Sequence, residues 1–188
     1  TKATGTLKHK GQTGDREYLS FYEGYAIYAK TDEDGVLTWL NDAATELDAL
    51  LNNTWNMKFE FVNGESVLTL NNANLIRTNA SFHIFNSHTT YGTYPVRVIT
   101  IANSYLQTPT TVFNYNGGGL TSLTFESVGN AKLTMKTTGG NAHLTNIPEI
   151  NFENANVEFI GVSSAGGAMS GGKLNITNST INIQKPVS

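Results

Sequence analysis

The feature that most constrains this chain is a short phrase, apolar-x-apolar-x-Asn-small-x-apolar, that returns along its length. Full copies lie at residues 68–75, 99–106, 150–157 and 174–181, and a degenerate copy at 123–128 has Ser127 in the asparagine column. The last four positions in that column are separated by steps of 24, 27 and 24 residues. Internal periods of this length indicate stacked structural repeats.

Within each copy the apolar residues alternate, which predicts two short strands with one buried face. The residue between the strands is an asparagine, which tolerates left-handed backbone angles and suits a tight corner. If successive corners stack, the amides can bond one another as a ladder. We therefore expect a mainly β chain that forms a parallel β-solenoid. The predicted ladder positions are Asn72, Asn103, Ser127, Asn154 and Asn178.

The phrase resembles the coils of right-handed parallel β-helices, in particular pectate-lyase-like domains, over about residues 59–183. The resemblance implies right-handed winding and an asparagine ladder at the corner between the second and third strands of each coil. It carries no activity by itself, because one fold hosts many functions. An antiparallel β-sandwich with Asn-rich turns is the alternative, although its hairpin loops would have no reason to keep a constant spacing.

Residues 1–35 are expected to form an extension with an aromatic hairpin at 18–29, and residues 36–188 the solenoid unit. Within that unit, apolar residues at helical spacing predict a helix at 38–52 that caps the first coil. Strands on either side of Asn63-Gly64 are expected to begin the coils. No capping element is evident after the last coil, which suggests a fragment of a larger protein.

Composition narrows the function classes. The net charge is −3 and Lys and Arg number only 12, which argues against a nucleic-acid binder. The sequence has no apolar run long enough to span a membrane. Cysteine is absent, and Asn, Thr, Gly and Ser are abundant. This composition favours an exported β protein, which we expect on the outside of a bacterial cell.

The carboxylates argue against an enzyme. Polysaccharide hydrolases and lyases need several carboxylates on one face, and this chain has no aspartate after Asp48. Glu126 and Glu153 share one column of the repeat, so a lyase or hydrolase that uses them with Lys132 is the enzyme alternative. Histidines lack the spaced partners of a metal site. We expect no enzyme activity, no metal and no cofactor.

The residues 87–95 form an insertion in the regular period, and insertions in solenoids often map to a binding face. Tyrosine offers a flat apolar face and a hydroxyl to a sugar or a protein. The predicted function is that of a bacterial surface adhesin domain that binds host glycan, mucin or matrix protein. A stalk or self-associating segment is a further alternative. The candidate ligand-binding residues are Tyr91, Tyr94, Arg97, Tyr105 and His88.

Overall fold

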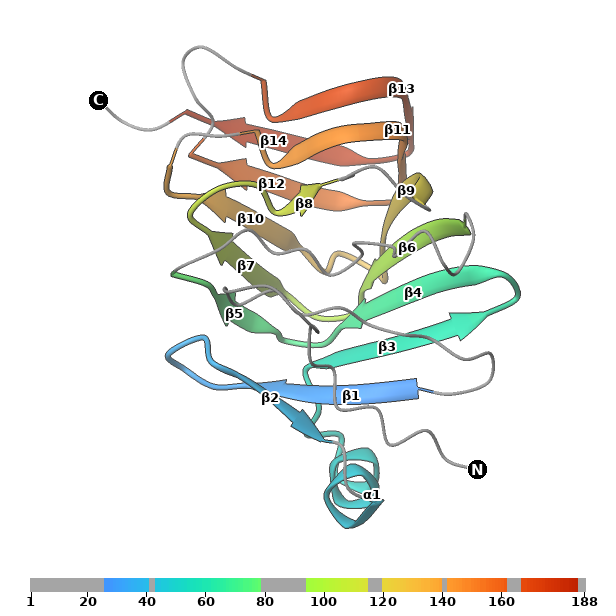
Figure 1. Ribbon diagram of the computed structural model, residues 1–188, viewed down its shortest axis with the longest axis vertical. Helices are drawn as coiled ribbons and strands as arrows, with labels where there is room; N and C mark the ends of the chain where they lie inside the picture. The colour runs from blue at the N-terminus through green and yellow to red at the C-terminus, as the bar shows by residue number, and fades with distance from the viewer. Residues whose placement is uncertain are drawn as a thin grey trace, which may run out of the picture.

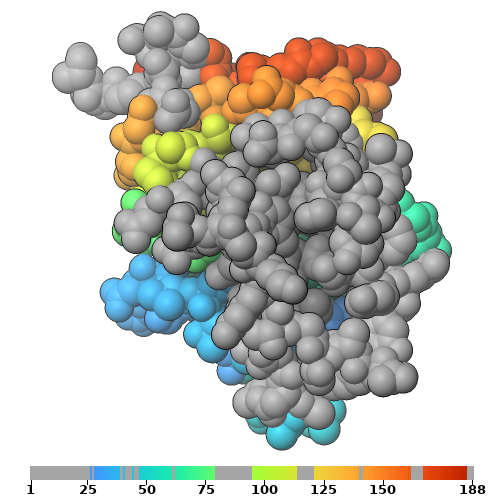
Figure 2. All heavy atoms as spheres, in the orientation of Figure 1, coloured from blue at the N-terminus to red at the C-terminus, as the bar shows by residue number. Residues whose placement is uncertain are grey.

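The alternating apolar residues form strands that wind into a parallel β-solenoid in the computed structural model of the chain (Figure 1). The structure describes residues 26–40, 43–78, 94–114, 120–139, 142–161 and 167–185. Each repeat of the phrase contributes one strand to a first sheet and the next strand to a second sheet. Figure 2 shows cyan and blue toward the bottom and orange and red at the top, with the cyan segment below the blue one.

All neighbouring strands from β4 onward run parallel, so the solenoid prediction is confirmed and the antiparallel sandwich was the wrong alternative. The first sheet contains β4 (Glu65–Leu70), β6 (Tyr94–Thr100), β9 (Leu120–Ser127), β11 (Leu144–Glu153) and β13 (Met169–Thr177), with β8 (Phe113–Asn114) beside β11. The second contains β5 (Asn74–Ile76), β7 (Ser104–Thr108), β10 (Leu133–Thr137), β12 (Asn156–Ile160) and β14 (Thr180–Gln184).

Three antiparallel strands extend the first sheet beyond β4: β3 (Met57–Val62), β1 (Ala26–Thr31) and β2 (Leu37–Leu40). The turn between β3 and β4 is Asn63-Gly64, as predicted, and both residues have positive φ, as a two-residue hairpin turn requires. β1 contains the C-terminal part of the predicted aromatic hairpin, but it pairs with β2 and β3. Residues 18–25 of that prediction lie outside the described residues.

The predicted helix at 38–52 is shorter in the structure, where α1 spans Ala43–Leu51. Leu37–Leu40 forms β2 instead, because its backbone pairs with β1 and this ladder overrides the helical spacing of Leu40. Ala49 is buried beside Tyr28 and Leu40, whereas Leu47 and Leu51 are 57% and 77% exposed. The helix lies below β2 in Figure 1, and a capping role for it stays a prediction.

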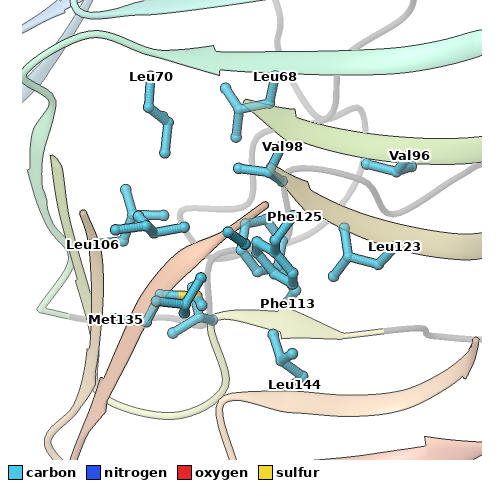
Figure 3. Packing of buried hydrophobic residues seen from close by; sticks show 14 of the residues in the cluster. Leu68, Leu70, Val96, Val98, Leu106, Phe113, Leu123, Phe125, Met135 and Leu144 are labelled. Carbon is cyan, nitrogen blue, oxygen red and sulfur yellow. The ribbon is translucent and has the colours of Figure 1, made fainter. Parts of the chain in front are cut away.

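The interior of the coils is filled by columns of apolar side chains, one from each sheet. Figure 3 shows side chains of both sheets pointing toward one another in this interior. Two phenylalanines of the first sheet, Phe125 and Phe152, stack with ring centres 5.2 Å apart and planes 13° apart. Phe152 also meets Phe159 of the second sheet edge to face. The two columns run Leu68, Val98, Phe125, Phe152, Ile176 and Leu75, Leu106, Met135, Phe159, Ile183.

The columns remain uncovered at the last described coil. Ile176 and Ile183 are 54% and 49% exposed, while their neighbours one coil back, Phe152 and Phe159, are fully buried. Leu174 is also about half exposed. These side chains face the interior direction of the solenoid, so their exposure follows from the absence of a further coil over them among the described residues.

The asparagine ladder is confirmed for two of its predicted members. Asn178 donates its amide to Oδ1 of Asn154 at 2.8 Å, and both residues have φ near +50°. Glu126, Glu153 and Thr177 are paired across their strands. Ser127 directly follows Glu126, so it lies in the same column as Asn154 and Asn178. Ser127 uses its hydroxyl to accept a hydrogen bond from the Asn156 amide at 2.9 Å. Here the ladder corresponds to the repeat read from the sequence.

Asn72 and Asn103 do not belong to that column, so this part of the ladder prediction was wrong. Leu70 and Thr100 take the ladder register in their coils. The reason is that the phrase at 68–75 begins two residues later against the strand register than the phrase at 150–157, and the phrase at 99–106 begins three residues later, so the same place in the phrase does not give the same position in space. The corners run from Leu70 to Asn74, Thr100 to Tyr105, Ser127 to Thr134, Asn154 to Glu158 and Asn178 to Asn182.

Candidate functional site: a polar groove beside the second sheet

An open groove of about 650 Å³ lies over the corner and the outward face of the second sheet. Outward side chains alternate with buried ones along each strand, so Asn74, Tyr105 and Thr134 form one register row beside inward Leu75 and Leu106. The loop between β1 and β2 closes one end of this row. The groove is lined by Thr31, Asp32, Glu33, Asn56, Asn72, Ala73, Asn74, Asn103, Ser104, Tyr105, Lys132 and Thr134.

Several lining amides hold the walls together. Asn74 donates its side-chain amide to the carbonyl oxygens of Asp32 and Glu33 at 3.1 and 3.0 Å, which fixes the loop against β5. Asn56 accepts from the Thr31 amide at 2.8 Å and donates to the carbonyl oxygens of Asn71 and Asn72. The N-terminal wall of the groove is therefore built before any ligand binds, which lowers the entropic cost of binding.

Two exposed asparagines keep free hydrogen-bonding groups toward the groove. Asn103 accepts from the Lys132 backbone amide at 2.8 Å through Oδ1, and its Nδ2 makes no hydrogen bond within the described residues. In the same part of the chain, the side chain of Asn72 has no hydrogen-bond partner. An amide can donate and accept, so these two groups suit the hydroxyl groups of a sugar.

Tyr105 lies in the middle of the row, between Asn74 and Thr134. Its hydroxyl donates to Oε1 of Gln107 at 2.7 Å, and this bond fixes the ring along β7. Burial of the side chain raises the pKa of the hydroxyl above its usual value, so the ring stays neutral at physiological pH. A held, neutral aromatic ring beside free amides is a platform on which a sugar ring can stack.

Among the described residues that line the groove, Lys132 is the one with an ammonium group. The charge of this group is compensated. Its Nζ lies 2.9 Å from Oε2 of Glu158, whose side chain is only 12% exposed. Thr134, Asn182 and Gln184 also donate to this carboxylate, at 3.1, 3.2 and 2.7 Å. The hydrogen bond from Lys132 lowers the pKa of Glu158, with help from Thr134 and Asn182, despite the opposing effect of burial.

The structure distributes the predicted ligand-binding residues over different places. Tyr105 lines the groove. Arg97 is on β6 of the first sheet, so it does not share the strand row of Tyr105. Tyr94 begins β6, and its side chain lies outside the described residues, as do Tyr91 and His88. The candidate site therefore retains one member of the predicted set within the described chain.

Arg97 is engaged by three glutamates of the same sheet, from β4, β9 and β11. Its Nε lies 3.2 Å from Glu65, and its Nη1 lies 3.1 Å from both Glu126 and Glu153. Burial alone would lower the pKa of Arg97, but the hydrogen bonds with Glu153 and Glu65 raise it. The predicted shared column of Glu126 and Glu153 is confirmed, while Lys132 lies at the corner just before β10 of the second sheet and pairs with Glu158.

Sequence reasoning missed most of the groove. Asn72 and Asn103 were predicted to belong to the ladder, and Lys132 to the alternative enzyme site, because the repeat phrase does not reveal its own offset from the strand register. One position of the phrase could have indicated the groove. It is the variable position after the small residue, and Asn74 and Tyr105 occupy it. Side chains at this position must point outward if Leu75 and Leu106, the next residues, point inward.

Comparisons with protein-family models, with curated proteins and with solved structures find no match to this chain. Among the described residues, no helix combines the length and apolar character needed to cross a membrane. In that same part of the chain, no three His, Cys, Asp or Glu side chains cluster in a way that could hold a metal ion.

Proposed function

We propose that this chain is a glycan-binding domain of a bacterial cell-surface adhesin, and that the groove around Tyr105 is its binding site. The observation that carries the proposal is a fixed aromatic ring in the same groove as Asn72 and Asn103, where the Asn72 amide and Nδ2 of Asn103 are free to bond hydroxyl groups within the described residues. Sugar sites combine such a platform with a few directed polar groups. Host glycans, mucins and glycosylated matrix proteins all present this chemistry.

The wider assignment is part of the same proposal. Low charge, no cysteine and an extended stack of coils suit an extracellular domain on a bacterial surface. We further propose right-handed, pectate-lyase-like coils whose N-terminal end is covered by the segment around α1. Continuous burial of Phe59, Leu68 and Val98 from β3 to β6 supports an end protected from solvent.

A binding role agrees better with the carboxylates than the lyase or hydrolase alternative does. Glu126 and Glu153 are held by Arg97, and Glu158 is held by Lys132, so each of these carboxylates already has a cationic partner. A general base needs a carboxylate that is free to take a proton from the substrate. Product release from pectin, alginate or hyaluronan would contradict the binding proposal.

The test compares glycan-array and mucin binding of the unaltered chain with Tyr105→Ala and Asn103→Ala variants. We expect each variant to lose binding about fivefold, since a stacked aromatic ring or a directed hydrogen bond contributes on the order of 1 kcal/mol. Asn175→Ala is the matched control, because Asn175 is a polar residue on the first sheet. A Tyr91→Ala/Tyr94→Ala variant tests the loop tyrosines. Unchanged binding in Tyr105→Ala would remove the groove as the site.

Self-association is a second candidate function, favoured by the uncovered columns at the last described coil. Leu174, Ile176 and Ile183 are each about half exposed, and β13 and β14 border the sheets there. Exposed apolar surface beside strand edges promotes association between chains. Sedimentation velocity over a hundredfold range of concentration tests it, and an Ile176→Lys/Ile183→Lys variant should abolish any association seen.

A further inference from the structure

The charges around the groove are unevenly compensated. Asp32 and Glu33 are exposed and form no ion pair within the described residues, although Asp32 Oδ1 accepts from the Val36 amide at 2.8 Å. At the other end, the ammonium group of Lys132 is bound by Glu158. A ligand in the groove therefore meets two unpaired negative charges and one positive charge that already has a partner.

Glu158 is placed to perform this compensation by the register of the second sheet. Residue 158 pairs with Thr134 on β10 and with Asn182 on β14, so its carboxylate lies between the two strands that supply its donors. Those donors are Lys132, Thr134, Asn182 and Gln184, and together they fix both carboxylate oxygens. The negative charge is thus held permanently next to the Lys132 ammonium group.

We infer that Glu158 sets the charge selectivity of the groove, so that the groove accepts uncharged sugar chains and rejects polyuronates and other anionic glycans. This inference rests on the proposed glycan-binding function and specifies its ligand class. An acidic sugar would approach Asp32 and Glu33 without a free cation to offset the repulsion. Such contacts between like charges weaken the binding of an anionic ligand and so exclude it from the groove. A neutral chain uses Tyr105 and the free amides at no such cost.

The experiment uses two probes of equal length, a galacto-oligosaccharide and the corresponding oligogalacturonide, which carries a carboxylate on each ring. Binding is followed by amide NMR shifts of Asn103, Tyr105 and Lys132 at low and at high salt. In the unaltered chain we expect the uronide to bind about tenfold more weakly or not at all at low salt. High salt should narrow the difference, because it screens exposed charges.

The decisive variant is Glu158→Gln, which keeps the side-chain shape and frees the Lys132 charge. We expect its affinity for the uronide to rise about tenfold at low salt, with the galacto-oligosaccharide affinity little changed. The gain should vanish in Glu158→Gln/Lys132→Met. Glu149→Gln is the matched control, because Glu149 binds Lys173 at 3.3 Å on the first sheet and does not line the groove.

A further variant keeps the inference testable if Glu158→Gln does not fold. Glu33→Gln alters an exposed loop residue and should raise uronide affinity, since it removes one of the two unpaired charges. Preferential binding of the uronide by the unaltered chain, or no gain in either variant, would overturn the inference. Failure of both probes to shift the groove amides of the unaltered chain would instead count against the glycan-binding proposal. In that case, uronide binding that appears in Glu158→Gln would still support the role of Glu158 in charge selectivity.

Discussion

Removal of the Phe152 side chain tests the stacked architecture most directly. Phe152 is fully buried, stacks on Phe125 and meets Phe159 edge to face. Truncation of a buried phenylalanine to alanine costs about 3–5 kcal/mol, and each lost aromatic pair adds about 0.5–1.5 kcal/mol to the burial term. We therefore expect Phe152→Ala to lower the free energy of unfolding by at least about 4 kcal/mol.

The matched control is Ile176→Ala, one coil further along the same column. Complete burial of an isoleucine contributes about 1.5–3 kcal/mol, and Ile176 is 54% exposed. Its truncation should therefore cost only about 1 kcal/mol. Guanidinium unfolding followed by circular dichroism and tryptophan fluorescence measures both values. Equal costs for the two variants at every protein concentration would refute the argument that the column ends uncovered at Ile176.

Three further outcomes follow from single residues. Asn154→Ala should lower the free energy of unfolding by about 1–2 kcal/mol because of its left-handed φ of 51°, and it also loses the amide hydrogen bond with Asn178. Asn154→Gly should lose only the hydrogen bond, because glycine adopts this φ without strain. Thermal unfolding measures both variants, and equal losses of stability would contradict this reasoning. Gly171→Ala should destabilise strongly because its Cβ would overlap the Ile147 carbonyl oxygen, while Gly64→Ala, whose Cβ would meet open space at φ +75°, should cost about 1 kcal/mol. Burial lowers the pKa of His143, whose Nε2 lies 2.8 Å from the Ile160 carbonyl oxygen. The unfolded chain therefore binds protons more readily, so stability should be complete above pH about 6.5 and fall as the pH drops below it, and a His143→Phe variant should lose that slope.

The repeat phrase was enough to predict parallel coils because its information is local. Alternating apolar residues such as Leu174 and Ile176 set the buried face of a strand, and Asn154 and Asn178 favour the left-handed corner by their own chemistry. The hairpin turn at Asn63-Gly64 is local in the same sense. Each of these features depends on a few adjacent residues, so a single sequence contains it.

The helix and the ladder show where local information fails. Leu40 has helical spacing with the residues after it, yet it lies in strand β2 because β1 offers this segment a backbone partner. Asn72 matches the phrase as well as Asn154 does, yet its corner places it two residues beyond the ladder register and beside the groove. Both outcomes depend on which strand lies next to the segment.

The sequence by itself therefore determined the kind of structure, which is strands of period two joined at asparagine corners in stacked coils. Tertiary structure alone decided which side chains meet, as in the pairing of Lys132 with Glu158 and of Arg97 with Glu65, Glu126 and Glu153. The physical reason is that strand register accumulates the lengths of all the corners between two residues. The phrase at 68–75 and the phrase at 99–106 begin two and three residues later against the strand register than the phrase at 150–157. This offset moves Asn72 and Asn103 from the ladder to the groove, and spacing along the chain does not record it.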